Sequence, residues 1–163
     1  MKRSDEDDFR DYVGASLDRW RRTAYLLCRD WHAADDIVSI TVGKVYDSWR
    51  KVSGADNRDA YAQRILTRTW LDEGRRPWRR EQPHAVLPEA TVPAAETIVD
   101  RDALAAFLAA LHPRQRAVVV LRFYLGYSIG ETAALLGIAE GTVKSQATRG
   151  LENLRTQLAL RPD

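Results

Sequence analysis

Cysteine is almost absent from this chain, because Cys28 is the only one among its 163 residues. A single thiol cannot form an intramolecular disulfide, and His32, His84 and His112 show no metal-ligand spacing with it. Apolar runs of the ~20 residues needed for a membrane span are also absent. The acidic residues 4–8 lack the basic and then apolar order of a signal peptide. These absences predict a cytoplasmic protein without disulfide, metal or cofactor and without membrane contact of its own.

Net charge is small, at +2, but it is unevenly distributed. Residues 1–80 hold 17 basic and 14 acidic side chains, residues 81–100 hold 4 acidic and no basic ones, and residues 101–163 hold 8 basic and 5 acidic ones. Charge distribution decides nucleic-acid affinity more than total charge does. The pattern favours two modules that each contact a polyanion, joined by an acidic connector that avoids it.

Prolines mark the connector. Four of the six prolines lie at positions 77, 83, 88 and 93, in a stretch without helical period. Proline removes an amide donor and restricts the preceding residue, so this density favours extended chain. We therefore predict a flexible linker over residues 81–97, a first domain over 1–80 and a second over 98–160.

Apolar residues at three- to five-residue intervals predict two amphipathic helices in the first domain, and a third over residues 58–74 follows the turn formers at 53–57. No strand signal of useful length occurs, and the valine run at 118–120 lies inside a longer helical pattern over 114–124. The sequence thus predicts an all-α fold of two small helical domains. The predicted buried positions are Phe9, Tyr12, Leu17, Trp20, Ala24 and Leu27, then Ile37, Val38, Thr41, Val45, Tyr46 and Trp49, and then Tyr61, Ile65 and Leu66.

The second domain carries the signals of a helix-turn-helix. Ser128 and Glu131 have capping-box spacing, which predicts a helix start, and Gly137 suits a left-handed helix exit. A second helix is predicted from about Glu140, although Ala139 cannot supply a side-chain cap. Its predicted apolar stripe consists of Val143, Ala147, Leu151, Leu154 and Leu158.

The first turns of this second helix carry polar residues suited to a DNA major groove. Lysine and arginine can contact phosphates or guanine, and glutamine can pair with adenine. The alternative interpretation is an ordinary helical hairpin with a solvated polar face. The residues concerned are Thr142, Lys144, Ser145, Gln146 and Arg149.

Basic and aromatic residues gather on and beyond the third helix. Guanidinium groups can neutralise phosphates while rings stack on bases, a combination that favours single-stranded DNA. The alternative is a solvated charged face with the aromatic rings in the core, and Tyr61 in particular could be a core residue. The residues are Tyr61, Arg64, Arg68, Trp70, Arg75, Arg76, Trp78, Arg79 and Arg80.

Taken in order, these motifs resemble the extracytoplasmic-function sigma factors of RNA polymerase, in their short actinobacterial form. Residues 136–145, LGIAEGTVKS, resemble the recognition helix of sigma region 4, and residues 111–118 resemble the helix before it. Residues 34–38, ADDIV, are similar to the region 2 segment that binds the polymerase clamp helices. Residues 60–72, with Arg75 and Arg76, resemble the part that reads and opens the minus-ten element.

The resemblance implies a non-enzymatic promoter-recognition subunit. Its implied partners are core RNA polymerase, through the largest-subunit clamp helices and the flap, promoter DNA, and an anti-sigma factor. The sequence departs from the family pattern at Ser39, Ile40, Arg68 and Gln146. The implied contacts are Asp35, Asp36, Ile37, Thr41, Lys44 and Trp49 for polymerase, Asn57, Arg58, Tyr61, Arg64 and Arg68 for the minus-ten element, and Ser128, Thr142, Lys144, Ser145, Gln146 and Arg149 for the minus-thirty-five element.

Two other functions compete with this interpretation. A helix-turn-helix operator-binding transcriptional regulator would use the same C-terminal motif, but it would not need the basic and aromatic third helix or the Asp35–Asp36 pair. That pair, at the predicted start of the second helix, could also serve only to meet the helix dipole. A DNA-processing enzyme would need an acidic metal cluster or a nucleophile–base pair, and the sequence shows neither.

Overall fold

The structure is a computed structural model that describes residues 1–74 and 95–160, and within these ranges every regular element is a helix. The all-α prediction is therefore confirmed for the described chain. The predicted linker at 81–97 lies outside the described residues except for its last three positions, which belong to helix α6. Arg75, Arg76, Trp78, Arg79 and Arg80 also lie outside the described residues.

The first helical group consists of α1 (Arg3–Cys28), α2 (Trp31–Asp47), α3 (Trp49–Ser53) and α4 (Arg58–Gly74). Helix α1 ends at Arg29, which adopts the left-handed conformation with φ 56°. The Asp30 carboxylate then accepts hydrogen bonds from the amides of His32 and Ala33, at 2.8 and 3.3 Å, and so caps α2. The third predicted helix has the predicted bounds.

The second group consists of α6 (Ala95–Ala109), α7 (Pro113–Val119), the π-helical turn η1 (Val120–Tyr124), α8 (Ile129–Leu136) and α9 (Glu140–Ala159). Pro113 stands in the first turn of α7, where its missing amide has no partner to lose. The valine run is buried, as predicted, although the last turn of that helix has π geometry.

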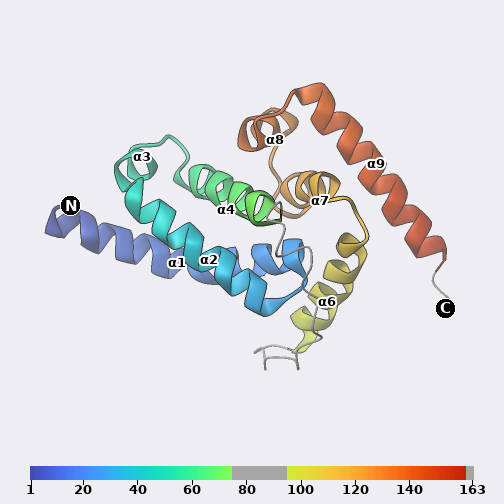
Figure 1. Cartoon of the computed structure of the whole chain (residues 1–163), viewed down its shortest axis with the longest axis horizontal. Helices are drawn as coiled ribbons and strands as arrows, with labels where there is room; N and C mark the ends of the chain where they lie inside the picture. Colours follow the sequence, from blue (N-terminus) through green and yellow to red (C-terminus); the bar gives the residue numbers. More distant parts are fainter. Residues whose placement is uncertain (75–94, 161–163) are drawn as a thin grey trace.

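Both groups share one apolar core. Trp20, Leu26 and Leu66 of the first group belong to the same buried cluster as Leu108 and Val120 of the second. Figure 1 shows the two groups side by side, with α8 next to α4 and with α6 and α7 next to the end of α1. A smaller cluster, Val118, Ala133 and Val143, fixes the helix-turn-helix itself.

Three positions predicted as buried are exposed: Leu17 by 39%, Tyr46 by 44% and Leu158 by 57%. Tyr46 lies one residue beyond buried Val45, which is a rotation of about 100° around the helix. In α1 the buried stripe runs through Val13, Ser16 and Trp20, and Leu17 lies at its edge. In α9, Leu154 still packs against the core, whereas Leu158 lies in the exposed last turn of the helix. Trp49 belongs to α3 and not to the end of α2.

Gly150 lies where α9 packs against α7. A Cβ atom placed on it would be 2.8 Å from Val119 Cγ2, a buried atom of a β-branched side chain that cannot rotate away freely. We predict that Gly150→Leu lowers the free energy of unfolding by ~1–3 kcal/mol through overpacking, measured by chemical denaturation followed by circular dichroism. Gly14→Ala is the matched control, because nothing lies within 4 Å of its added Cβ. The control should gain ~1 kcal/mol from helix propensity. Equal stability changes in the two variants would contradict the predicted close approach.

Candidate nucleic-acid interface

The outer surface of α2 carries the acidic pair predicted to contact polymerase. Asp35 and Asp36 are both exposed, in the second turn of α2. The Asp35 carboxylate pairs with Arg21 Nε at 2.7 Å, and the Arg21 guanidinium also lies 4.6 Å from the centre of the Trp31 ring. The helix begins at Trp31, so Asp30, and not the predicted Asp35–Asp36 pair, caps the N-terminus of α2.

The other residues predicted to contact polymerase are differently placed. Ile37, Thr41 and Trp49 are at most 3% exposed and belong to the interior, so their side chains do not lie on the outer surface. Thr41 Oγ1 donates to the Ile37 carbonyl at 2.7 Å. Lys44 is exposed, and its Nζ donates to Thr69 Oγ1 at 3.0 Å, which ties α2 to α4. Asp35, Asp36 and Lys44 are therefore the predicted contacts that a partner can reach.

Asn57 and Arg58, two of the predicted minus-ten contacts, hold the start of α4 in place. Asn57 Oδ1 accepts from the Ala60 amide at 3.0 Å and thereby caps the helix. The Arg58 guanidinium lies 5.5 Å from the Tyr12 ring centre and 5.3 Å from the Trp49 ring centre. Both residues therefore have structural tasks in addition to any contact with DNA.

Asp59 was not singled out in the sequence, yet it anchors α4 to α1. Its Oδ1 accepts from the Tyr12 hydroxyl at 2.8 Å and from Arg19 Nη2 at 3.1 Å. Burial, followed by the hydrogen bond to Asp59, raises the pKa of Tyr12 above its ordinary range, so the phenol keeps its proton. Arg19 and Asp59 are both substantially exposed, so this ion pair contributes little by itself and mainly fixes the position of α4.

Tyr61, Arg64 and Arg68 do not form one open surface. Tyr61 is half-buried against the apolar core, whereas Arg64 is exposed. Arg68 Nε donates to the Leu135 carbonyl of α8 at 3.2 Å. Helix α8 therefore covers the part of α4 that carries Arg68.

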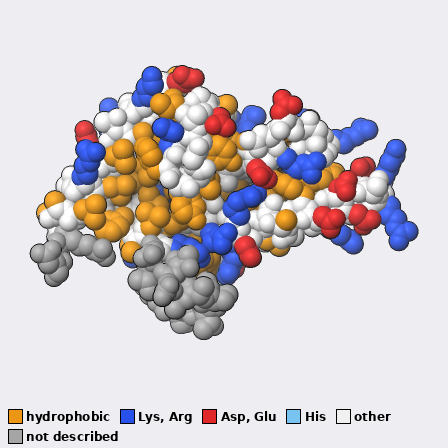
Figure 2. Space-filling view, turned by 180° about the vertical axis from the view of Figure 1, so that it is seen from behind, with side chains coloured by type: hydrophobic (Ala, Val, Ile, Leu, Met, Phe, Trp, Pro, Cys, Tyr) orange, Lys and Arg blue, Asp and Glu red, His pale blue; other side chains and the backbone are white. Residues whose placement is uncertain are grey.

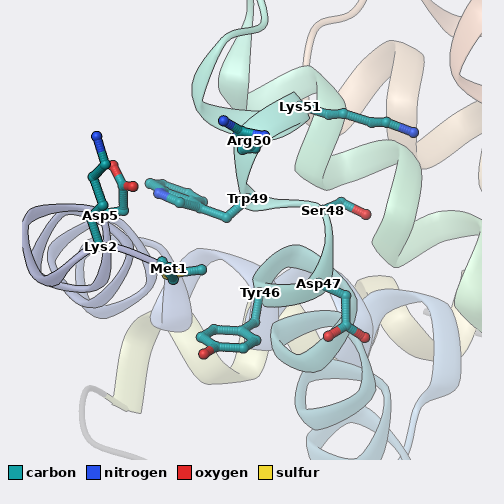
Figure 3. Close-up of a pocket in the computed structure, with 9 residues that line it drawn as sticks. All are labelled: Met1, Lys2, Asp5, Tyr46, Asp47, Ser48, Trp49, Arg50 and Lys51. Atoms are coloured by element: carbon teal, nitrogen blue, oxygen red, sulfur yellow. The ribbon is translucent and has the colours of Figure 1, made fainter.

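An open cavity of about 690 Å³ lies between the start of α1 and the α2–α3 corner (Figure 3). Trp49 lines it and also contacts the Arg58 guanidinium, so the cavity adjoins the start of α4 through a shared ring. Its lining carries three basic and two acidic side chains, and these opposing charges by themselves select no ligand class. The lining residues are Met1, Lys2, Asp5, Tyr46, Asp47, Ser48, Trp49, Arg50 and Lys51.

The helix-turn-helix signals are confirmed in detail. The Glu131 amide donates to Ser128 Oγ at 3.0 Å, and the Ser128 amide donates to Glu131 Oε1 at 2.9 Å, which completes the capping box. Gly137 ends α8 at φ 65°, in the left-handed region that favours glycine. Ala139 precedes α9 without a side-chain cap, as predicted.

The first turns of α9 present their polar side chains outward. Val143 is fully buried and points into the small cluster with Val118 and Ala133, so the opposite side of the helix faces solvent. Ser145 Oγ donates to the Thr142 carbonyl at 3.1 Å. The exposed residues are Thr142, Lys144, Ser145 and Arg149, Gln146 is half-buried, and Ser128 is exposed at the start of α8.

Arg116 joins the two helical groups and was not identified from the sequence. Its guanidinium donates to the Leu108, Ala109 and Leu111 carbonyls at the end of α6, at 2.8, 3.1 and 3.0 Å, and to the Leu27 carbonyl of α1 at 2.6 Å. Burial lowers the pKa of Arg116 from its ordinary value. No short-range pattern predicts the contact between the two helical groups, because the Leu27 partner in α1 is 89 positions away.

Comparisons with known proteins agree with the geometry. A family model described as Sigma-70 region 2 matches residues 13–80, and one described as Sigma-70, region 4 matches residues 101–154. The RNA polymerase sigma-E factor of Streptomyces coelicolor is 36% identical over 155 residues, which cover 94% of this chain and 88% of that protein. The chain belongs to the extracytoplasmic-function sigma factors.

Other sigma factors are similar over most of the chain. The ECF RNA polymerase sigma factor SigE of Mycolicibacterium smegmatis is 36% identical over 159 residues, which cover 91% of this chain and 61% of that protein. Among solved structures, the sigma factor RpoE of Bartonella quintana, in complex with the anti-sigma factor NepR, has a TM-score of 0.76 at 26% identity, with coverage of 95% of this chain and 99% of that one. CnrH in complex with the cytosolic domain of CnrY shares the fold, with a TM-score of 0.67 at 20% identity and coverage of 96% and 91%.

Sigma factors bind core RNA polymerase and promoter DNA and direct promoter-specific transcription initiation, and this chain is a sigma factor. They are initiation factors and not known enzymes. The operator-binding alternative is not favoured, because the chain matches a Sigma-70 region 2 model in addition to a region 4 model. Within the described ranges, 1–74 and 95–160, no helix is long and apolar enough to cross a membrane.

The capping box gives a pH-dependent prediction. Hydrogen bonds from Ser128, first from its backbone amide, lower the pKa of Glu131 below its ordinary value of 4.5. Because the folded-state pKa is depressed, the stabilisation is present above pH ~4.5 and is lost as the pH falls through the folded-state pKa. We predict that Glu131→Gln is less stable than the parent at neutral pH and that this difference shrinks below pH ~4.5, measured by urea denaturation across pH. A stability difference that is independent of pH would exclude the carboxylate as its source.

Proposed function

We propose that residues 1–80 dock on core polymerase and hold the melted minus-ten strand, that residues 98–160 bind the minus-thirty-five duplex, and that residues 81–97 connect them. The observation that carries this proposal is the exposed polar start of α9. Buried Val143 on the inner side and the left-handed turn at Gly137 fix the orientation of this helix start, so that Lys144 and Arg149 face solvent together. A helix presented in this way suits a major groove.

For the minus-ten element we propose α4 as the binding helix, with the exposed Arg64 as its accessible basic group. Asn57 and Arg58 support this role by fixing the start of α4, and half-buried Tyr61 offers only part of its ring. An arginine next to aromatic surface can neutralise a phosphate while a base stacks. Tyr61, Arg64 and Arg68 are our proposed strand contacts, and Arg68 must leave Leu135 to make its contact.

For polymerase we propose the exposed side of α2, with Asp35, Asp36 and Lys44 as the contacts and with the buried Ile37, Thr41 and Trp49 supporting them from inside. The Arg21–Asp35 pair is half exposed on each side, so a basic partner surface can compete with it. Asp36 lies beside this pair in the sequence and adds a second negative charge to the same turn.

We further propose an anti-sigma factor as a regulating partner, a cytoplasmic location and no catalytic activity of this chain. The proposed anti-sigma partner rests on two similar structures, in which RpoE is in complex with the anti-sigma factor NepR and CnrH is in complex with the cytosolic domain of CnrY. Hydrophobic side chains gather on the half of the molecule formed by α6, α7 and α9 (Figure 2). Phe123, Leu158 and Leu160 are more than half exposed, which suits a protein partner or the polymerase flap.

The direct test is reconstitution. The purified chain is mixed with core RNA polymerase and a library of promoter fragments, and run-off transcripts are sequenced. The proposal predicts transcripts that start downstream of one shared pair of sequence elements. Equal transcription with and without the chain would contradict it.

We predict that Asp36→Arg weakens core polymerase binding at least tenfold, because it reverses charge on the exposed side of α2 without touching the core. The measurement is fluorescence anisotropy of the labelled chain titrated with core polymerase. Asp18→Arg, an equally exposed change on α1, is the matched control and should bind normally. Normal affinity of the folded Asp36 variant would remove α2 from the polymerase interface.

We predict that Lys144→Ala and Arg149→Ala weaken promoter binding in distinguishable ways. A lost phosphate contact reduces the slope of log affinity against log salt by about one and affects all sequences equally, whereas a lost base contact costs ~1–3 kcal/mol at one base pair. Arg155→Ala, also exposed on α9 but beyond the predicted contacts, is the control. If Lys144→Ala and Arg149→Ala both match the parent in salt dependence and sequence preference, α9 is not the recognition helix.

A further inference from the structure

The start of α4, the helix proposed to hold the minus-ten strand, is anchored to α1 through one carboxylate. Asp59 is the second residue of α4, and its Oδ1 accepts hydrogen bonds from the Tyr12 hydroxyl at 2.8 Å and from Arg19 Nη2 at 3.1 Å. Tyr12 and Arg19 are seven positions apart, about two turns of helix, so they lie on the same side of α1. Two donors from one side of α1 thus meet at one oxygen atom of α4.

The ring of Tyr12 also acts on the turn before α4. The Arg58 guanidinium lies 5.5 Å from the centre of the Tyr12 ring and 5.3 Å from the centre of the Trp49 ring. Arg58 Nη2 donates to the Ser53 carbonyl at 3.3 Å, which closes the turn at residues 53–57. Tyr12 therefore reaches the start of α4 by two separate contacts, one through its hydroxyl and one through its ring.

Tyr12 is itself held against the core. Its ring packs edge-on against Trp20 at 5.9 Å between centres and lies 5.7 Å from the ring centre of Trp49. Both tryptophans are at most 3% exposed. Ser16 Oγ donates to the Tyr12 carbonyl at 2.8 Å. The hydroxyl that holds Asp59 therefore extends from a packed ring and not from a loose surface side chain.

The charge at this helix start matters for a nucleic-acid strand. A melted strand brings phosphates to α4, where the exposed Asp59 carboxylate repels them. Arg19 lies on that carboxylate and offsets its charge. A surface that already has the geometry of its bound state also avoids the cost of ordering when the ligand binds. The contacts from α1 thus favour strand binding in two ways, through charge and through geometry.

We propose that Tyr12 and Arg19 are positioning residues for minus-ten recognition, which act through Asp59 on the turn at residues 53–57 and on the start of α4. The inference rests on the proposed function of α4. Neither side chain needs to touch DNA. Their contacts set the strand-binding surface before the strand arrives, so α1 takes part in promoter opening although it carries none of the predicted DNA contacts.

The first test removes only the hydroxyl. Tyr12→Phe keeps the ring, so the contact with Arg58 and the core packing remain. We expect this variant to shorten the lifetime of the open complex by about threefold to tenfold, while its affinities for core polymerase and for the closed complex stay within about twofold of the parent. The lifetime is measured as the decay of permanganate reactivity at minus-ten thymines after a heparin challenge. A parent-like lifetime overturns the role of the hydroxyl.

The second test asks whether Tyr12 acts through Asp59. Asp59→Ala removes the acceptor, so adding Tyr12→Phe to this variant should change the open-complex lifetime no further. The comparison is internal to the Asp59→Ala background, which cancels the separate effect of removing a negative charge near the phosphates. Equal losses of lifetime on adding Tyr12→Phe to the parent and to the Asp59→Ala variant overturn the proposed route.

The third test addresses the charge. We expect Arg19→Gln to shorten the open-complex lifetime and Arg19→Lys to restore part of it, because lysine keeps a cation beside Asp59 but not the arginine geometry. Arg10→Gln, an exposed change on the same helix, removes the same charge and is the matched control, with a parent-like lifetime expected. Equal lifetimes for Arg19→Gln and Arg10→Gln overturn the role of Arg19.

Stability and function are separated by two further readings. If Tyr12→Phe lowers the melting temperature but keeps a parent-like lifetime at a temperature at which it is folded, Tyr12 is structural only and the positioning role is wrong, although the proposed function stands. If the parent chain with core polymerase opens no promoter at all, the proposed function fails and the positioning role falls with it.

Discussion

The guanidinium of Arg116 is the interaction on which the rest of the arrangement depends. It satisfies carbonyls at the ends of two helices, α6 and α1, that belong to different domains, and it lies over Trp70 of a third helix. Carbonyls at a helix C-terminus lack intrahelical donors and carry partial negative charge, so a buried cation is stabilised there. A single side chain thus fixes the end of α1 against region 4, and the shared apolar core closes around it.

That constraint gives the two proposed DNA-binding surfaces different accessibility. The start of α9 is held from beneath by Val143 and remains open to solvent. The side of α4 that carries Arg68 is instead covered by α8. The same helix-turn-helix therefore leaves the start of α9 exposed and covers part of α4, so the two proposed DNA-binding surfaces are not equally accessible in this structure.

Local signals in the sequence predicted much of this fold. Ser128 with Glu131, Gly137 and the turn formers before Arg58 set helix ends through contacts within a few residues, and these ends are confirmed. The predicted burial of Leu17, Tyr46 and Leu158 was wrong, because the neighbouring helices and not the apolar residue itself decide how much of a helix surface is covered. The family resemblance identified region 2 and region 4, but it could not show which of their residues lie inside.

Long-range contacts could not be read from the sequence at all. The Leu135 partner of Arg68 and the Leu27 partner of Arg116 are 67 and 89 positions away, and a short-range pattern carries no information about them. Ile37, Thr41 and Trp49 follow the family pattern and yet are buried, which only the packing of α2 against its neighbours reveals. Gly150 had a signal in principle, since a glycine inside a long amphipathic helix often marks a close approach, here to Val119.

The central claim is that the chain reads a promoter in two places, as duplex through α9 and as melted strand through α4. It is tested most directly by permanganate footprinting of Arg64→Ala holoenzyme on a duplex promoter and on the same promoter with a pre-melted bubble. The account predicts normal closed-complex binding, reduced opening of the duplex, and partial recovery on the bubble, where the cost of unpairing has been removed in advance. Parent-like opening of the duplex by the folded variant would contradict it.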